Sequence, residues 1–313
     1  MSATHTASAD EAFTTALDRL SKLSVEKHFD AYADVDWEAP EMQVDPSDPR
    51  WLPLAGDPLV ATDWYGSLAP EERSRYGLYR IAASMKTGWH FENMLQRGLL
   101  LRAFRLPNRA PEFRYIHHEI IEESQHTLMF QELVKRSGLP VRGMPRWVRL
   151  VGPVAVGVTA RWLPAAFFFL VLGGEEPADH VQRQTLRRGH PHPLVERIMR
   201  IHVTEEARHV SFARHSLRRE VPRLNWVRRR LLAVQVPLVM AIMARLMLAP
   251  AGDLRRCGLP RHVARRAMRS PEGRCLLADS VGKIRVLCDE LGLMTPTGRL
   301  AWRAVGLAQD GDG

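Results

Sequence analysis

The chain has 313 residues, 45% of them hydrophobic, enough to bury a large core, and no linker rich in proline, glycine or serine divides it, so we expect one domain over 1–313. Its three cysteines, Cys257, Cys275 and Cys288, lack Cys-x-x-Cys spacing, which argues against a disulfide framework or structural zinc and predicts a cytoplasmic location. Aromatic residues do not interleave with the arginine clusters behind the net charge of +9, which argues against nucleic acid as a partner.

The first part of the chain precedes the main helical region. Residues 1–12 are small, polar and acidic, which predicts a disordered tail and no secretory signal. Helical spacing follows over 10–23. Residues 33–58, rich in proline, aspartate and tryptophan, are expected to form an ordered outer loop.

A long helix is predicted from Pro70 to about Phe104, because proline suits a first helical turn and Glu71 and Glu72 favour its dipole. Glu92 falls on the apolar stripe of this helix. A carboxylate in that position needs a partner.

The next helix, about 110–137, carries Glu123 and His126 and ends at a glycine-proline stop. A loop rich in glycine, proline and arginine is expected after it. The stretch from Pro164 to Pro177 is apolar all round and predicts a buried central helix. Pro177 would clash with the carbonyl of Gly173, so we expect a kink or bulge beside Glu175 and Glu176.

Three potential metal ligands lie on the helix that closes near residues 220–222. His202, Glu206 and His209 fall within about 60° of arc on one helical face. Further helices are expected over 224–248, 260–269 and 272–291, and no alternating strand pattern occurs, so the predicted fold class is all-α. The apolar stretches 151–173 and 231–250 are interrupted by arginine and proline, which favours buried helices over membrane spans.

The Glu-x-x-His pattern occurs twice, at Glu123/His126 and Glu206/His209, and a carboxylate on an apolar helix, Glu92 or Glu175, lies 31 residues before each glutamate. This is the ligand pattern of carboxylate-bridged di-iron or di-manganese bundles. Equal separations predict two antiparallel hairpins related by a pseudo-twofold axis. We therefore expect a ferritin-like bundle over about 70–222, with a buried di-metal site and extra peripheral helices.

Alternatives stay open at several positions. Glu122 and Glu205 could replace Glu123 and Glu206 as partners of the histidines at i,i+4 spacing, and Glu176 could replace Glu175. Asp179 could orient a ligand histidine. His117, His118 and His180 are expected outside the ligand set.

The motifs His90-Phe91-Glu92-Asn93, Glu122-Glu123-Ser124-Gln125-His126, Glu175-Glu176-Pro177 and His202-x3-Glu206-x2-His209 resemble those of the p-aminobenzoate N-oxygenase (AurF-like) di-iron oxygenases. His202 is the most specific mark, because it adds a third histidine to the usual two. The resemblance covers about residues 72–220. It implies the ligand set Glu92, Glu123, His126, Glu175, His202, Glu206 and His209.

The resemblance further implies two iron ions, O2 as co-substrate and an external electron donor, with oxygen inserted into an arylamine to give hydroxylamine, nitroso or nitro products. A carboxylate and imidazole set also accepts manganese. The implied partners are a small amine and a redox protein such as a ferredoxin or reductase, for which the arginine clusters could be a docking surface. Hydroxylation or desaturation of a carbon substrate, and a non-enzymatic metal-binding bundle, are the alternatives. Apolar helices near 231–248 could form a homodimer interface.

Overall fold

The computed structural model describes residues 3–189, 191–249 and 258–308. In these ranges the chain is helical without strands, which confirms the all-α prediction. The helices are α1 (Ala3–Glu26), α2 (Asp63–Gly66), α3 (Pro70–Ala103), α4 (Glu112–Ser137), α5 (Arg146–Trp162), α6 (Pro164–Arg188), α7 (Pro193–Glu220), α8 (Trp226–Leu248), α9 (Arg261–Arg269), α10 (Pro271–Ser280), α11 (Gly282–Glu290) and α12 (Pro296–Ala304), with short 3-10 helices η1 (Pro40–Met42), η2 (Pro58–Ala61) and η3 (Val221–Arg223).

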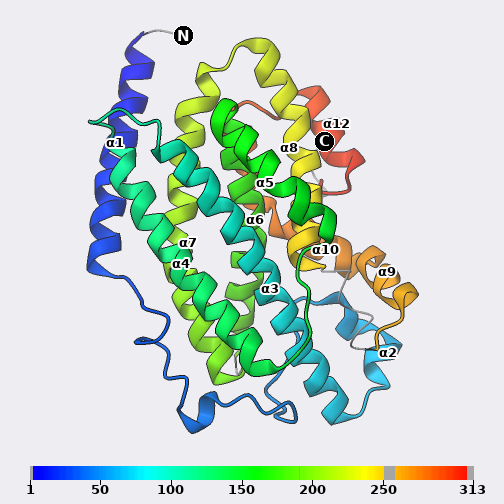
Figure 1. Cartoon of the computed structure of the whole chain (residues 1–313). Helices are drawn as coiled ribbons and strands as arrows, with labels where there is room; N and C mark the ends of the chain where they lie inside the picture. Colours follow the sequence, from blue (N-terminus) through cyan, green and yellow to red (C-terminus); the bar gives the residue numbers. More distant parts are fainter. Residues whose placement is uncertain (1–2, 190, 250–257, 309–313) are drawn as a thin grey trace.

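The centre of the fold is a bundle of four long helices (Figure 1). Helix α3 packs along α4, and α6 packs along α7, while α4 also contacts α7 and α3 contacts α6. The ends of these helices follow from local chemistry. The Glu72 carboxylate accepts the Ala69 N–H at 2.8 Å at the start of α3, and Gly138 ends α4 in the left-handed conformation.

Peripheral helices cover the bundle, as Figure 1 shows. Helix α1 packs on α4 and α7, α5 packs on α3 and α6, and α8 packs on α6 with α12 beside it. The start of α1 differs from the predicted disordered tail, because the helix begins at Ala3. Asp10 is held in it by Arg219 (2.8 Å) and Arg223 (2.6 Å), partners that lie far away in the sequence.

Helix α5 was expected to be largely loop. Its glycines were the misleading signal, because Gly152 allows close packing: a Cβ there would lie 2.5 Å from Met94 Sδ. The expectation that residues 151–173 are buried is also wrong for α5, which buries only Val148 and Ala160. It holds for α6, where Phe167, Phe168 and Phe169 are each 1% exposed.

Two other helices differ from the sequence prediction. Helix α6, described along its whole length, runs as one α-helix through Pro177, so the expected bulge is not seen. The helix expected over 272–291 is divided into α10 and α11 at Val281, and α12 was not predicted.

Helix α8 is long and apolar enough to cross a membrane by length and composition alone. Of the apolar 18-residue stretch that meets this criterion, 44% is buried inside the protein, and one such helix is weak evidence for a span.

Candidate metal centre

The structure gathers all seven predicted ligands inside the four-helix bundle. Each is at most 2% exposed. The residues are Glu92 from α3, Glu123 and His126 from α4, Glu175 from α6, and His202, Glu206 and His209 from α7. The described part of the chain brings them together as three overlapping groups whose ligand atoms lie within 4.8 Å of one another. Their role as metal ligands remains a prediction.

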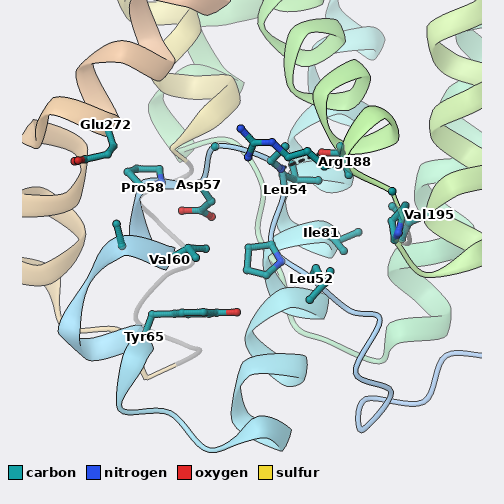
Figure 2. A pocket seen from close by; sticks show the side chains of 17 residues that line it. Leu52, Leu54, Asp57, Pro58, Val60, Tyr65, Ile81, Arg188, Val195 and Glu272 are labelled. Atoms are coloured by element: carbon teal, nitrogen blue, oxygen red, sulfur yellow. Dashed lines mark hydrogen bonds between the residues drawn. The ribbon is translucent and has the colours of Figure 1, made fainter.

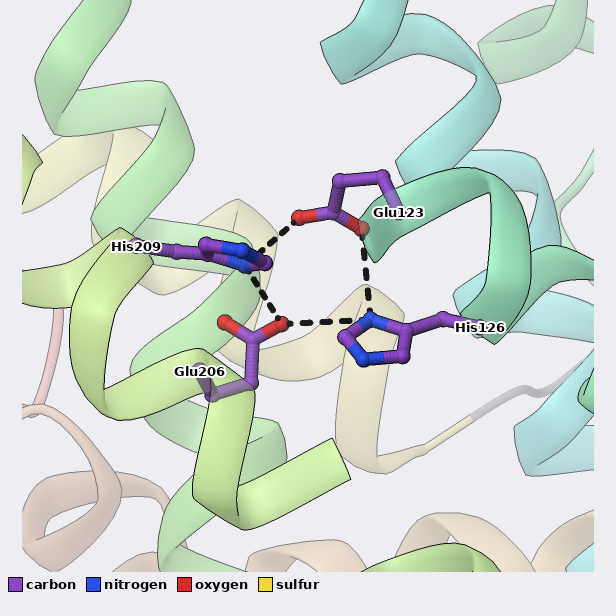
Figure 3. A group of neighbouring side chains, drawn as sticks. All are labelled: Glu123, His126, Glu206 and His209. Carbon is purple, nitrogen blue, oxygen red and sulfur yellow. Dashed lines mark hydrogen bonds and ion pairs between the residues drawn. The ribbon is translucent and has the colours of Figure 1, made fainter. Parts of the chain in front are cut away.

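The middle of the site is a ring formed by the two Glu-x-x-His pairs (Figure 3). His209 Nδ1 lies 3.0 Å from Glu123 Oε1 and 3.1 Å from Glu206 Oε1. His126 Nδ1 lies 3.6 Å from Glu123 Oε2 and 3.6 Å from Glu206 Oε1. Each carboxylate therefore faces both histidines, which is the position that a ligand bridging two metal ions requires.

The other three candidates complete the site on one side of this ring. His202 Nε2 lies 3.4 Å from Glu92 Oε1 and 3.7 Å from Glu206 Oε1. Glu175 forms a group with His202 and Glu206. The Thr127 hydroxyl donates to Glu92 Oε2 at 3.2 Å and so orients that carboxylate.

The outer nitrogens of two histidines are held across the bundle. Glu122 of α4 lies 2.8 Å from Nε2 of His209 on α7, and Glu205 of α7 lies 2.9 Å from Nε2 of His126 on α4. This reciprocal arrangement is what a pseudo-twofold relation between the two hairpins produces. Glu122 and Glu205 were the alternative partners of the histidines four residues later on the same helix. They pair instead with a histidine of the opposite helix, and Nδ1 of each histidine faces the centre.

Arg208 connects these two carboxylates. Its Nη2 lies 2.9 Å from Glu122 Oε1 and 3.4 Å from Glu205 Oε1, and the residue is 6% exposed. Arg208 was not predicted from the sequence. Its position three residues after Glu205 was the only local signal, and such pairs are common on helix surfaces. Glu119, a buried residue of α4, was not predicted either.

The electrostatics of the whole site favour cations. Burial and the carboxylate of Glu123 raise the pKa of Glu92 well above its usual range. Burial and the carboxylates of Glu206 and Glu123 do the same to the pKa of Glu175. Burial alone would lower the pKa of His126, but its bonds to Glu123 and Glu205 raise it well above normal. The raised pKa values show that the negative charges of these close carboxylates repel one another. Divalent cations bound between the carboxylates would offset that repulsion.

Unpartnered atoms support the same conclusion. Glu123 Oε2, His126 Nδ1, Glu175 Oε1 and Glu206 Oε2 are buried without a hydrogen-bond partner. Buried polar atoms normally have one, so these need an explanation. Because they are the donor atoms that iron and manganese accept, and because they converge, the residues present fit a di-metal centre.

Several sequence candidates lie outside the cluster. Glu176 pairs with Arg214, so Glu175 is the glutamate of this pair that reaches the centre. Asp179 accepts from Arg183 at 2.7 Å, so the expectation that it orients a ligand histidine is wrong. His117, His118 and His180 are absent from the three groups, with ring contacts to Phe113, Arg114 and Gln184.

Comparison with known proteins identifies the family of the chain. The family described as P-aminobenzoate N-oxygenase AurF matches residues 10–292. Uncharacterized proteins of Mycobacterium tuberculosis (strains CDC 1551 and H37Rv) and Mycobacterium bovis are similar to the chain, each 44% identical over 299 residues that cover 94% of this chain and 88% of the relative. The match spans every helix that contributes to the centre, and the chain therefore belongs to the P-aminobenzoate N-oxygenase AurF family of ferritin-like di-iron proteins.

Proposed function

We propose that the protein is a non-haem di-iron oxygenase that uses O2 to N-oxygenate an arylamine, giving a hydroxylamine, nitroso or nitro product. The observation that carries this proposal is the place of His202, a third histidine within the buried carboxylate cluster of a chain of this family. Two iron ions held by the seven residues would supply the activation of O2 when bound.

The surrounding residues would prepare the ligands for this chemistry. With metal bound, Glu122 and Glu205 would hold the proton on Nε2 of His209 and of His126, so that Nδ1 of each ring would offer its lone pair to the metal. Thr127 fixes one oxygen of Glu92. The burial of all seven side chains excludes bulk water from the ligands.

We further propose a cytoplasmic enzyme that takes electrons from a redox protein such as a ferredoxin or reductase. Arg228, Arg230, Arg265 and Arg266 are exposed and could receive an acidic partner, while Arg255-Arg256 lies outside the described residues. Exposed apolar residues on α8, among them Trp226 and Leu238, support the predicted homodimer. Size-exclusion chromatography with light scattering tests the dimer: a monomer would contradict it and a large cage would favour metal storage.

The test of the function begins with metal. After anaerobic loading with Fe(II), elemental analysis should find about two iron ions per chain, as expected for this ligand set. A His209→Ala variant should lose iron. The matched control His118→Ala should keep it, because His118 lies outside the cluster.

The loaded protein is then given a chemical reductant, 18O2 and a panel of arylamines. Mass spectrometry should find 18O on nitrogen. Products labelled only on carbon would instead support a hydroxylase, and desaturated products a desaturase. Iron bound without any oxygenated product from the panel would contradict the proposed N-oxygenation.

A further inference from the structure

A cleft of about 450 Å³ opens beside the bundle, between the loop over 52–58, the end of α6 and the start of α10 (Figure 2). Its walls are mostly apolar and include Leu52, Val60 and Ile81. Arg188 and Glu272 are its exposed charged residues. A cleft of this size and character suits a small, largely apolar molecule.

A second, smaller cavity of about 30 Å³ lies against the metal centre. Glu92, Glu175 and His202 line it, so it reaches the ligands on the side where the third histidine stands. Its volume has room for about one small group of the size of a water molecule. A ring cannot occupy it unless a neighbouring side chain moves.

Leu54 lies between the two cavities. Among the described residues, it is the one that lines both the outer cleft and the cavity at the metal centre. It is also part of the wall of a third cavity, of about 20 Å³, next to the second. Leu54 therefore lies in the wall that the outer cleft shares with the cavity at the candidate ligands.

The backbone around Leu54 is held at three points. The Trp51 ring stacks on His192 at 3.9 Å, the Ala55 N–H donates to Thr185 Oγ1 at 3.0 Å, and the Asp57 carboxylate accepts from Arg80 Nε at 2.7 Å. These contacts join this segment to the residue that precedes α7, to α6 and to α3. Because the backbone is held, the size and rotamer of the half-buried Leu54 side chain set how far the two cavities are separated at this point.

The inner cavity also contains an unused hydrogen-bond acceptor. Gln182 lines it and is 8% exposed, and its Oε1 atom has no hydrogen-bond partner. A buried acceptor of this kind favours a ligand that brings an N–H or O–H donor. An apolar molecule with a slim donor group at one end satisfies both the cleft and the cavity.

We infer that the outer cleft is the access route for the substrate, that Leu54 determines which substrates reach the metal centre, and that Gln182 positions the donor group of the substrate there. The inference rests on the proposed function and adds the route and the residues that select for size. An arylamine fits this description, with its ring on the side of Leu54 and its amino group toward Gln182.

The first experiment measures access to the ferric centre with two probes, azide, which is slim, and phenol, which carries a ring. Stopped-flow absorption gives the association rate of each. Leu54→Ala should speed phenol about tenfold and azide less than twofold, and Leu54→Phe should slow phenol. Leu52→Ala is the matched control, because Leu52 is exposed and lines only the outer cleft.

Phenol rates that are the same in both Leu54 variants and the wild-type protein, or that change equally in Leu52→Ala, would overturn the role of Leu54. The outcome is independent of the proposed reaction. If phenol access depends on residue 54 but no arylamine is oxygenated, only the proposed N-oxygenation is contradicted. If arylamines are N-oxygenated but the Leu54 variants leave phenol access unchanged, only the present inference is contradicted.

The second experiment tests Gln182 with zinc-loaded protein, in which no turnover occurs. Calorimetry should show that Gln182→Met weakens aniline binding about fivefold, the loss expected for one hydrogen bond. Toluene, which lacks a donor, should bind equally to both proteins. Gln184→Met is the control on the same helix, since Gln184 pairs with His180 at 2.8 Å. Unchanged aniline binding in Gln182→Met would remove Gln182 from the inference.

Discussion

Replacing Arg208 by methionine should destabilise the metal-free protein, because Arg208 is the buried cation between two buried carboxylates. Its Nη2 lies 2.9 Å from Glu122 and 3.4 Å from Glu205, and all three residues are at most 6% exposed. Removing one partner of a buried ion pair costs about 3 to 5 kcal/mol. We expect the lower end, about 3 kcal/mol, because His209 and His126 still bond to the two carboxylates.

Urea unfolding of the metal-free protein, followed by helical circular dichroism, measures this loss. The matched control is Arg200→Met on the same helix α7. Arg200 pairs with Glu196 at 2.6 Å across one turn, but both residues are partly or fully exposed to solvent. Such a pair contributes about 0.3 to 0.5 kcal/mol, so the control should be nearly as stable as the wild-type protein.

A double variant tests whether charge is the cause. In Arg208→Met/Glu122→Gln, the carboxylate closest to the lost cation is also neutral, so part of the stability, about 1 kcal/mol, should return. Iron retention should fall about tenfold in Arg208→Met, since residues behind metal ligands have effects of this order. A loss in Arg208→Met no larger than in Arg200→Met, or no recovery in the double variant, would refute the reasoning.

Three further predictions concern other parts of the chain. Burial and two nearby cations hold the pKa of His90 at about 4, so the unfolded chain takes up a proton that the folded protein does not. Stability should therefore fall as the pH drops from about 6.5 to 4, and His90→Gln should reduce this fall by about 1 kcal/mol in urea titrations, after allowance for solvent screening. Gly174→Ala should lower the free energy of unfolding by about 1 to 3 kcal/mol, because a Cβ there would lie 2.0 Å from the Phe91 ring. Gly157→Ala is the control and should not lower it, because the nearest atom to a Cβ at that position is 3.7 Å away. Thermal unfolding compares the two variants. Burial raises the pKa of Cys288 to about 12, so Cys288→Ala should not change the number of thiols that a thiol reagent titrates in the native protein; a lower number would contradict this.

The sequence by itself determined which residues share a helical face. The spacing of Glu123 and His126, and of Glu206 and His209, places each pair on one side of its helix whatever surrounds it, because the helical repeat is local. The apolar stripe around Glu92 predicted its burial for the same reason, and Glu92 is 1% exposed. The all-α class and the four bundle helices were within reach of this local argument.

The tertiary structure alone decided which groups meet across helices. Glu122 holds His209 and Glu205 holds His126, and Arg208 lies between the two carboxylates, because helices α4 and α7 pack with a particular rotation and height. The spacing of residues along one helix predicts neither the rotation nor the relative height of the two helices. The same limit applies to Leu54, which comes from a loop without regular structure and lines the cavity at the centre because contacts with α3, α6 and the residue before α7 hold that loop. Side chains on one helix are ordered by the backbone repeat, whereas partners from distant segments are chosen by packing, which depends on the whole chain.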